Sequence, residues 1–226
     1  MTVRVLVVDD QALVRAGLVA IIRSDPGLTV VGEAEDGHEA IARAAAIPAD
    51  VVLMDIRMPG LDGVAATRAI LAQSADPAPK ILILTTFDLD EHVFAALRAG
   101  ASGFMLKDTP AEEMLKAIAT VARGEVLLAP SVTRRLVQHF VSKPEPDLRT
   151  PEELAQLTGQ ETAVLRLVGQ GLTNQQIASS LNIAQATVKS HLGRLMTKLK
   201  LSSRAQAVVT AYESGLIVVG DGSVRS

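Results

Sequence analysis

The first part of the chain alternates short apolar runs with longer segments whose apolar residues recur at helical spacing. The runs predict five β-strands, at residues 3–8, 29–34, 51–54, 80–85 and 103–106, and the segments between them predict helices, the last at about 111–123. This alternation predicts an α/β domain whose parallel sheet carries helices on both faces and is joined by right-handed crossovers.

The second part of the chain shows no strand pattern. Residues 125–157 allow a short helix at 131–141, and Pro144 and Pro146 then mark a domain boundary within a polar stretch. Beyond it, Thr158 and Glu161 have the spacing of a helix capping box. Three or four helices are expected from there on. The second of these helices, at 174–181, is short, and a tight turn separates it from a longer third helix. This arrangement predicts a helix-turn-helix.

The third of these helices has one apolar face, formed by residues that recur at about 100° per residue: Val188, Leu192, Leu195 and Leu199. The opposite face has small residues at its centre and cations or hydroxyls beside them: Ala186, Ser190, Gly193 and Thr197, flanked by Lys189, Thr187 and Arg194. Small residues let a helix lie close to base edges, and the flanking groups can meet phosphates, so this face favours DNA recognition. The pattern alone also fits an ordinary amphipathic surface helix.

Composition and charge narrow the class of protein. A chain of 226 residues with 48% apolar content suggests a globular protein of one or two domains. No apolar run reaches the ~18 residues of a membrane span, and no signal-peptide pattern opens the chain, so the cytoplasm is the expected location. Without cysteine there is no disulfide or thiolate zinc site. Residues 1–124 carry 11 Lys and Arg against 17 acids, a net −6, whereas residues 158–217 carry 6 against 2, a net +4, which hints at nucleic acid bound by the C-terminal part.

Acidic residues end two of the predicted strands. Asp55 follows the apolar run at 51–54, and Asp9 and Asp10 follow the run at 3–8. The carboxyl ends of parallel strands share one sheet edge, where ligands bind in open α/β sheets. Carboxylates held close together raise each other's pKa or demand a cation, and an oxygen-only cluster suits Mg²⁺. The alternative is that Asp9 and Asp10 cap the following helix, although a cap needs only one acid.

Two further polar residues are expected at the same edge. The fourth strand leads to Thr85, and the fifth leads to Lys107. Acids, a hydroxyl and an ammonium together favour phosphoryl transfer, because Mg²⁺ and Lys can neutralise the phosphoryl oxygens while a carboxylate attacks. Taken singly, Thr85 also fits an ordinary strand residue and Lys107 a solvated surface lysine.

These residues, with the run from Met58 to Gly63, resemble the receiver domain of two-component response regulators over residues 1–124. The resemblance implies a doubly wound (βα)₅ flavodoxin-like fold and phosphorylation of Asp55 by a sensor histidine kinase. It also implies Mg²⁺ held by Asp10, Asp55 and the backbone carbonyl of Arg57, with Asp9 reached through water. Thr85 and Phe104 would form the switch pair. Asp108 stands where many receivers have proline, and Arg57 and Phe87 would overlook the path of a hydrolytic water.

Residues 154–217 resemble a LuxR-type helix-turn-helix DNA-binding domain, through 171–174, 177–178, 187–191, 198–199 and 204–207. A receiver followed by this domain resembles the NarL/FixJ family, with a linker at 125–153 and a tail at 218–226. The DNA contacts expected from the resemblance are Thr173, Thr187, Lys189, Ser190, Gly193 and Arg194. The final helix, 204–214, would serve dimerisation. Ala184, Gln160 and Gln176 depart from the family pattern, and Ala184 is a poor N-cap.

The sequence therefore predicts a cytoplasmic, DNA-binding response regulator that dimerises on phosphorylation or DNA binding, uses Mg²⁺, and catalyses only its own phosphotransfer and dephosphorylation. A magnesium-dependent aspartyl-phosphate phosphatase is one alternative. Such enzymes need a second acid two residues after the nucleophile, where this chain has Arg57. A transcription factor that acts without phosphorylation is the other, although it leaves the acids, hydroxyl and lysine at one edge without a reason to coincide.

Overall fold

The structure is a computed structural model that describes residues 2–74, 77–86, 91–124 and 154–217. The chain divides into two compact units, residues 1–127 and 128–226, and each is described by itself. The predicted helix at 131–141, the linker, the tail and Phe87 lie outside the described residues. Within the described part, no helix is long and apolar enough to cross a membrane, and the expected cytoplasmic location stays a prediction.

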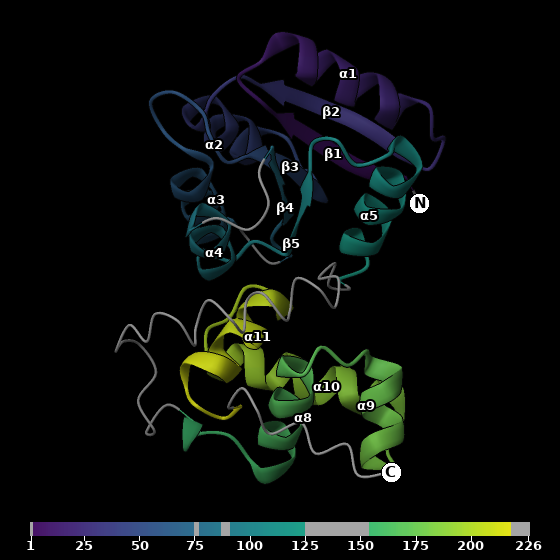
Figure 1. The fold of residues 1–226 in the computed structure, drawn as a ribbon, viewed down its shortest axis with the longest axis vertical. Helices are drawn as coiled ribbons and strands as arrows, with labels where there is room; N and C mark the ends of the chain where they lie inside the picture. Colours follow the sequence, from purple (N-terminus) through teal and green to yellow (C-terminus); the bar gives the residue numbers. More distant parts are fainter. Residues whose placement is uncertain (1, 75–76, 87–90, 125–153, 218–226) are drawn as a thin grey trace. The chain divides into compact units, whose positions relative to one another are not determined.

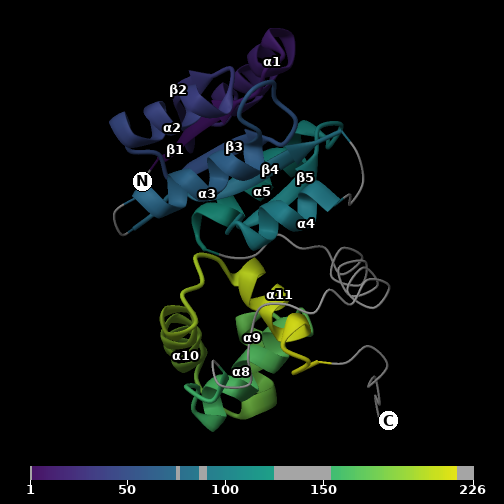
Figure 2. The ribbon, with the colours of Figure 1, turned by 90° about the vertical axis from the view of Figure 1, so that its left-hand side faces the viewer.

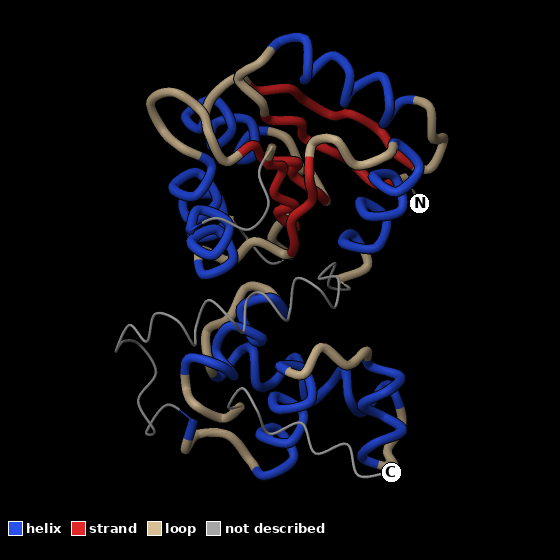
Figure 3. The backbone as a smooth tube through the Cα atoms, in the orientation of Figure 1, coloured by secondary structure: helices blue, strands red, loops and turns tan. Residues whose placement is uncertain are grey.

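A five-stranded parallel sheet forms the centre of the first unit (Figure 3). Its strands are β1 (Val3–Val8), β2 (Leu28–Ala34), β3 (Val51–Asp55), β4 (Lys80–Thr85) and β5 (Gly103–Leu106), in the spatial order β2-β1-β3-β4-β5. All five predicted strands are present, and their bounds differ from the prediction by at most one residue. The central strand β3 is buried along its whole length, which explains its unbroken apolar sequence.

Helices cover both faces of the sheet, as the alternating pattern predicts (Figure 1). They are α1 (Ala12–Arg23), α2 (Gly37–Ala46), α3 (Gly63–Gln73), α4 (Glu91–Arg98) and α5 (Ala111–Ala122). One core cluster joins α1 and α5 to the sheet through Leu18, Ile22, Ile118 and the alternate residues Val51 and Leu53 of β3. The unit is a doubly wound α/β fold whose sheet edge, formed by the carboxyl ends of its strands, is held in place by buried apolar side chains on both faces.

The second unit consists of helices in its described residues (Figure 2). They are α8 (Gly159–Gly169), α9 (Asn174–Leu181), α10 (Gln185–Lys198) and α11 (Arg204–Glu213). The predicted capping box of Thr158 and Glu161 opens α8, and Thr173 and Gln176 form a second one at α9. Asn182 ends α9 in the left-handed conformation, with φ of 53°, and makes the tight turn before α10. As expected for alanine, Ala184 makes no side-chain cap of α10.

Candidate functional site

The carboxyl edge of the sheet brings the three predicted acids together. Asp9 follows β1, and Asp55 ends the neighbouring strand β3. Val8 is in register with Met54, so the residues that follow them, Asp9 and Asp55, lie next to each other at the edge. Each of the three acids offers a carboxylate oxygen within 4.8 Å of the others. Asp9 is fully buried and Asp55 is 4% exposed, whereas Asp10 faces solvent. An oxygen-only set with one solvent-facing member fits Mg²⁺, which retains water ligands when bound by carboxylates.

Lys107 completes this cluster. Its ammonium lies 2.7 Å from Asp9 and 2.8 Å from Asp55, and its side chain is 10% exposed. Although burial lowers the pKa of Lys107, its hydrogen bond to Asp55 and its ion pair with Asp9 raise that pKa above the ordinary value. Burial raises the pKa of Asp55, and the Lys107 hydrogen bond opposes this effect. The cluster holds three carboxylates and one ammonium, so it has an excess of negative charge that a divalent cation would neutralise.

Neither acid at the end of β1 is the N-cap of α1. That position is Gln11, and no side chain caps the helix. The carboxylate of Asp9 accepts a hydrogen bond of 2.9 Å from the Gln11 N–H through one oxygen, while its other oxygen faces Lys107. The capping alternative therefore does not explain why two acids stand here.

Thr85 and Phe104 occupy neighbouring strands beside the cluster. Thr85 is 3% exposed at the end of β4, and its carbonyl accepts a hydrogen bond of 2.8 Å from the Lys107 N–H. Phe104 is 7% exposed on β5, in register with Ile83, two residues before Thr85. The edge thus includes the predicted hydroxyl, and the aromatic ring lies buried on the adjacent strand.

The loop between β3 and α3 closes tightly over Asp55. Gly63 donates a backbone hydrogen bond of 2.9 Å to Ile56, and a Cβ at Gly63 would lie only 2.0 Å from the Asp55 carbonyl oxygen. Arg57 N–H points to the Asp55 carboxylate at 3.4 Å. Ile56 and Met58 are 2% and 7% exposed and anchor the loop in the core. The glycine in the Asp62-Gly63 motif is therefore required by close approach of two backbone segments.

Arg15 also contributes to the site, which the sequence pattern did not indicate. Its guanidinium donates a hydrogen bond of 2.6 Å to the Asp9 carbonyl and lies 3.6 Å from Glu33 on β2. These contacts hold the turn that carries Asp9 and Asp10. An arginine one turn into the helix after the acids is the only sequence signal, and an exposed helix residue would look the same.

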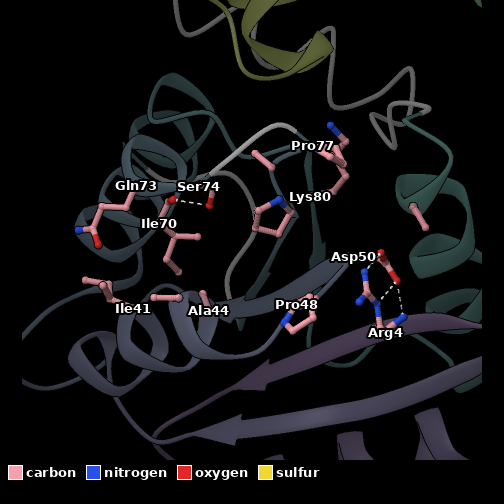
Figure 4. Close-up of a pocket in the computed structure, with 15 residues that line it drawn as sticks. Arg4, Ile41, Ala44, Pro48, Asp50, Ile70, Gln73, Ser74, Pro77 and Lys80 are labelled. Atoms are coloured by element: carbon pink, nitrogen blue, oxygen red, sulfur yellow. Dashed lines mark hydrogen bonds and ion pairs between the residues drawn. The ribbon is translucent and has the colours of Figure 1, made fainter.

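A groove of about 680 Å³ lies at the opposite, amino-terminal edge of the sheet (Figure 4). Arg4, Asp50 and Lys80, which stand at or beside the starts of strands, line it together with Ile41 and Pro48. Arg4 and Asp50 lie side by side in its lining and form an ion pair at 2.8 Å (Figure 4). None of the predicted site residues lines the groove, so it does not belong to the acidic cluster.

In the second unit, α10 buries its predicted apolar stripe: Val188, Leu192, Leu195 and Leu199 are at most 9% exposed. The residues predicted for DNA contact on this helix, Thr187, Lys189, Ser190, Gly193 and Arg194, are all exposed. A Cβ at Gly193 would have no neighbour within 4 Å, so the centre of this face is open. Thr173 is also exposed, although its hydroxyl accepts the capping hydrogen bond of Gln176.

An ion pair and a set of arginine hydrogen bonds, neither of which the sequence pattern revealed, connect the helices of this unit. Lys198, at the end of α10, lies 2.6 Å from Glu161, whose side chain is 3% exposed on α8. This hydrogen bond and that of the Thr158 N–H lower the pKa of Glu161. Arg204, at the start of α11, donates to the Asn174 side chain and to the Leu172 carbonyl. Both contacts span more than 29 residues of sequence, so local periodicity contains no signal for them.

A doubly wound sheet with acids and a lysine at its carboxyl edge, joined to a helix-turn-helix unit with an open helix face, defines a DNA-binding response regulator. The family model of the response regulator receiver domain matches residues 5–119, and that of the bacterial regulatory proteins of the luxR family matches residues 155–211. The transcriptional regulatory protein YxjL of Bacillus subtilis (strain 168) is 42% identical over 217 residues, covering 95% of this chain and 97% of that protein.

Solved structures of response regulators also match this chain over most of its length. The response regulator ChrA of a heme-sensing two-component system is 39% identical, with a TM-score of 0.51 over 96% of this chain and 99% of that one. A structure of two RcsB dimers bound to two parallel DNAs is 25% identical, with a TM-score of 0.54 over 94% of this chain and 99% of that one. The chain belongs to the response regulators that combine a receiver domain with a LuxR-type DNA-binding domain.

Proposed function

We propose that Asp55 is the phosphoacceptor and that a sensor histidine kinase is the donor. A carboxylate oxygen of Asp55 attacks the phosphorus of a phosphohistidine, the new P–O bond forms, and the P–N bond to the imidazole breaks. The observation that carries this proposal is the placement of Asp55 beside Asp9 at the strand end, with the Lys107 ammonium 2.8 Å away. The chain's own chemistry is limited to this transfer and to the later hydrolysis of the acyl phosphate.

Mg²⁺ is the proposed cofactor, held by Asp10, Asp55 and the backbone carbonyl of Arg57, with Asp9 reached through water. When bound, the ion neutralises charge on the phosphoryl oxygens. Lys107 supplies the second positive charge on the same group. The compact set of carboxylate oxygens within 4.8 Å supports this assignment.

Thr85 and Phe104 are the proposed switch. The Thr85 hydroxyl would donate to a phosphoryl oxygen, and its movement toward the phosphoryl group would free space that the Phe104 ring can enter. The burial of both side chains, 3% and 7% exposed, supports a packed pair that has discrete arrangements. Phosphorylation would thereby favour a dimer able to bind promoter DNA.

DNA contact is assigned to α10 and the start of α9, through Thr173, Thr187, Lys189, Ser190, Gly193 and Arg194. The domain division proposed is a receiver at 1–124, a linker at 125–153, a DNA-binding domain at 154–217 and a tail at 218–226. The open, exposed face of α10 and the net charge of +4 over residues 158–217 support this assignment.

The test is labelling by a small phosphodonor, read by mass spectrometry of the intact chain. Asp55→Asn should abolish the label, whereas Asp108→Asn, which changes an exposed acid next to Lys107, should leave it unchanged. Undiminished labelling of the Asp55→Asn chain would contradict the assignment. Light scattering and DNA binding with and without a phosphate mimic then test whether the modified protein dimerises and binds DNA more tightly.

A further inference from the structure

The start of α2 packs directly against the loop between β3 and α3. A Cβ built at Gly37 would lie 2.4 Å from the Leu61 carbonyl oxygen and 3.0 Å from the Leu61 Cβ and Cγ atoms. Gly37 has no left-handed φ, so its backbone does not require glycine. Glycine is needed at this position because two backbone segments meet here and leave no room for a side chain.

Local hydrogen bonds hold the Gly37 side of this contact. Asp36 caps α2 by accepting a hydrogen bond of 2.8 Å from the Glu39 N–H, and the Glu39 carboxylate accepts one of 3.0 Å from the Glu35 N–H. Together these two bonds hold the first turn of α2 and the residue before its cap. A side chain added at Gly37 would therefore press on Leu61 from a helix end that these bonds hold in place.

The loop on the other side carries Arg57, whose backbone carbonyl is a proposed Mg²⁺ ligand. Ile56 and Met58, on either side of Arg57, are buried, and the Gly63 N–H at the end of the loop donates a hydrogen bond to the Ile56 carbonyl at its start. Leu61, where α2 presses on the loop, lies two residues before Gly63, so a shift at Leu61 reaches Ile56 and the adjacent Arg57 through the hydrogen bond from Gly63 to Ile56. Relief of the 2.4 Å contact to at least 3.0 Å would move loop or helix by about 0.6 Å.

We propose that the contact between Gly37 and Leu61 positions the metal-binding loop, so that Gly37 is a positioning residue for Mg²⁺. The inference rests on the proposed Mg²⁺ site. Mg²⁺ demands near-ideal octahedral geometry at about 2.0–2.1 Å, so a displacement of the loop by this amount weakens binding. The structure thereby links the start of α2, which contributes no ligand, to occupancy of the site.

The experiment perturbs the contact from both sides in the full-length chain. Gly37→Ala pushes the loop away from α2, and Leu61→Ala removes the side chain that packs over Gly37. The matched controls are Gly17→Ala, at an exposed α1 position with no neighbour within 4 Å, and Leu115→Ala, at a half-buried α5 position. Isothermal titration measures the Mg²⁺ dissociation constant, and urea unfolding without Mg²⁺ measures stability.

Both test variants should bind Mg²⁺ about tenfold more weakly, the lower end of the loss when a residue that orients metal ligands is changed. Both controls should keep the wild-type dissociation constant whatever their stability. If Gly37→Ala does not fold, Leu61→Ala decides alone. Wild-type affinity in a folded test variant would show that α2 yields instead of the loop, which overturns the inference. Failure of the unmodified chain to bind Mg²⁺ would instead overturn the proposed cofactor, and this inference with it.

Discussion

Replacement of Lys107 by methionine tests the electrostatics of the acidic cluster. The substitution keeps an unbranched side chain but removes the only ammonium within ion-pair distance of Asp9 and Asp55 among the described residues. Both carboxylates are buried, at 0% and 4% exposed, so they would face each other without a cation. Removal of one partner from a buried ion pair costs about 3–5 kcal/mol.

The loss expected for Lys107→Met is about 3 kcal/mol in the free energy of unfolding, at the low end of that range. The low end applies because burial already raises the pKa of Asp55. Without Lys107 this carboxylate can take up a proton, which relieves part of the repulsion with Asp9. Mg²⁺ should restore much of the loss, since it neutralises the same carboxylates. The stabilisation by Mg²⁺ should therefore be larger in the variant than in the unmodified chain.

Urea unfolding followed by circular dichroism, in EDTA and in Mg²⁺, measures both effects. The chain has one tyrosine and no tryptophan, and Tyr212 lies on α11, so tyrosine fluorescence reports on the second unit and should not change. The matched control is Lys116→Met, which breaks an exposed pair with Glu112 and should have no measurable effect. Equal losses in the two variants, or a loss at Lys107 that Mg²⁺ does not reduce, would refute the reasoning.

Four further outcomes are expected. Lys189→Ala should weaken binding to all DNA equally and reduce the salt slope by about one unit, and an effect confined to one base position would indicate a base contact instead. Gly193→Ala should stabilise the second unit by about 1 kcal/mol, because the helix position is open; an unchanged tyrosine-monitored midpoint would contradict this. In the folded protein the pKa of Glu161 is lowered, so the stabilisation from its ionised carboxylate is complete above the ordinary value of 4.5 and is lost as the pH falls below that value. The tyrosine-monitored unfolding midpoint, measured across acid pH, tests whether stability falls in this direction. Phosphorylated protein should lose its label slowly after the donor is removed. The double variant Arg57→Asn/Phe87→Glu should lose it faster, because polar side chains can hold the attacking water, and equal decay rates in the variant and the unmodified chain would contradict that account.

The sequence by itself determined the order of strands and helices and most of the acidic edge. An unbroken apolar run reflects a strand buried on both faces, and helical periodicity reflects a helix buried on one face. Both patterns are local properties of the chain. The carboxyl ends of parallel strands meet at one edge of a sheet, so the sequence places Asp9, Asp55 and Lys107 together. The capping box at Thr158 was predictable for the same reason, since its partners lie three residues apart.

Only the tertiary structure decided which side chains and backbone groups of separate elements touch. The contact of Gly37 with Leu61, the Arg15 hydrogen bond to the Asp9 carbonyl, and the pairing of Lys198 with Glu161 join separate elements. No periodicity marks them, because an arginine, lysine or glycine on a helix has the same local pattern whether it faces solvent or a neighbouring segment. Their partners are set by how the helices pack on the sheet and on one another, and that packing depends on the whole chain at once.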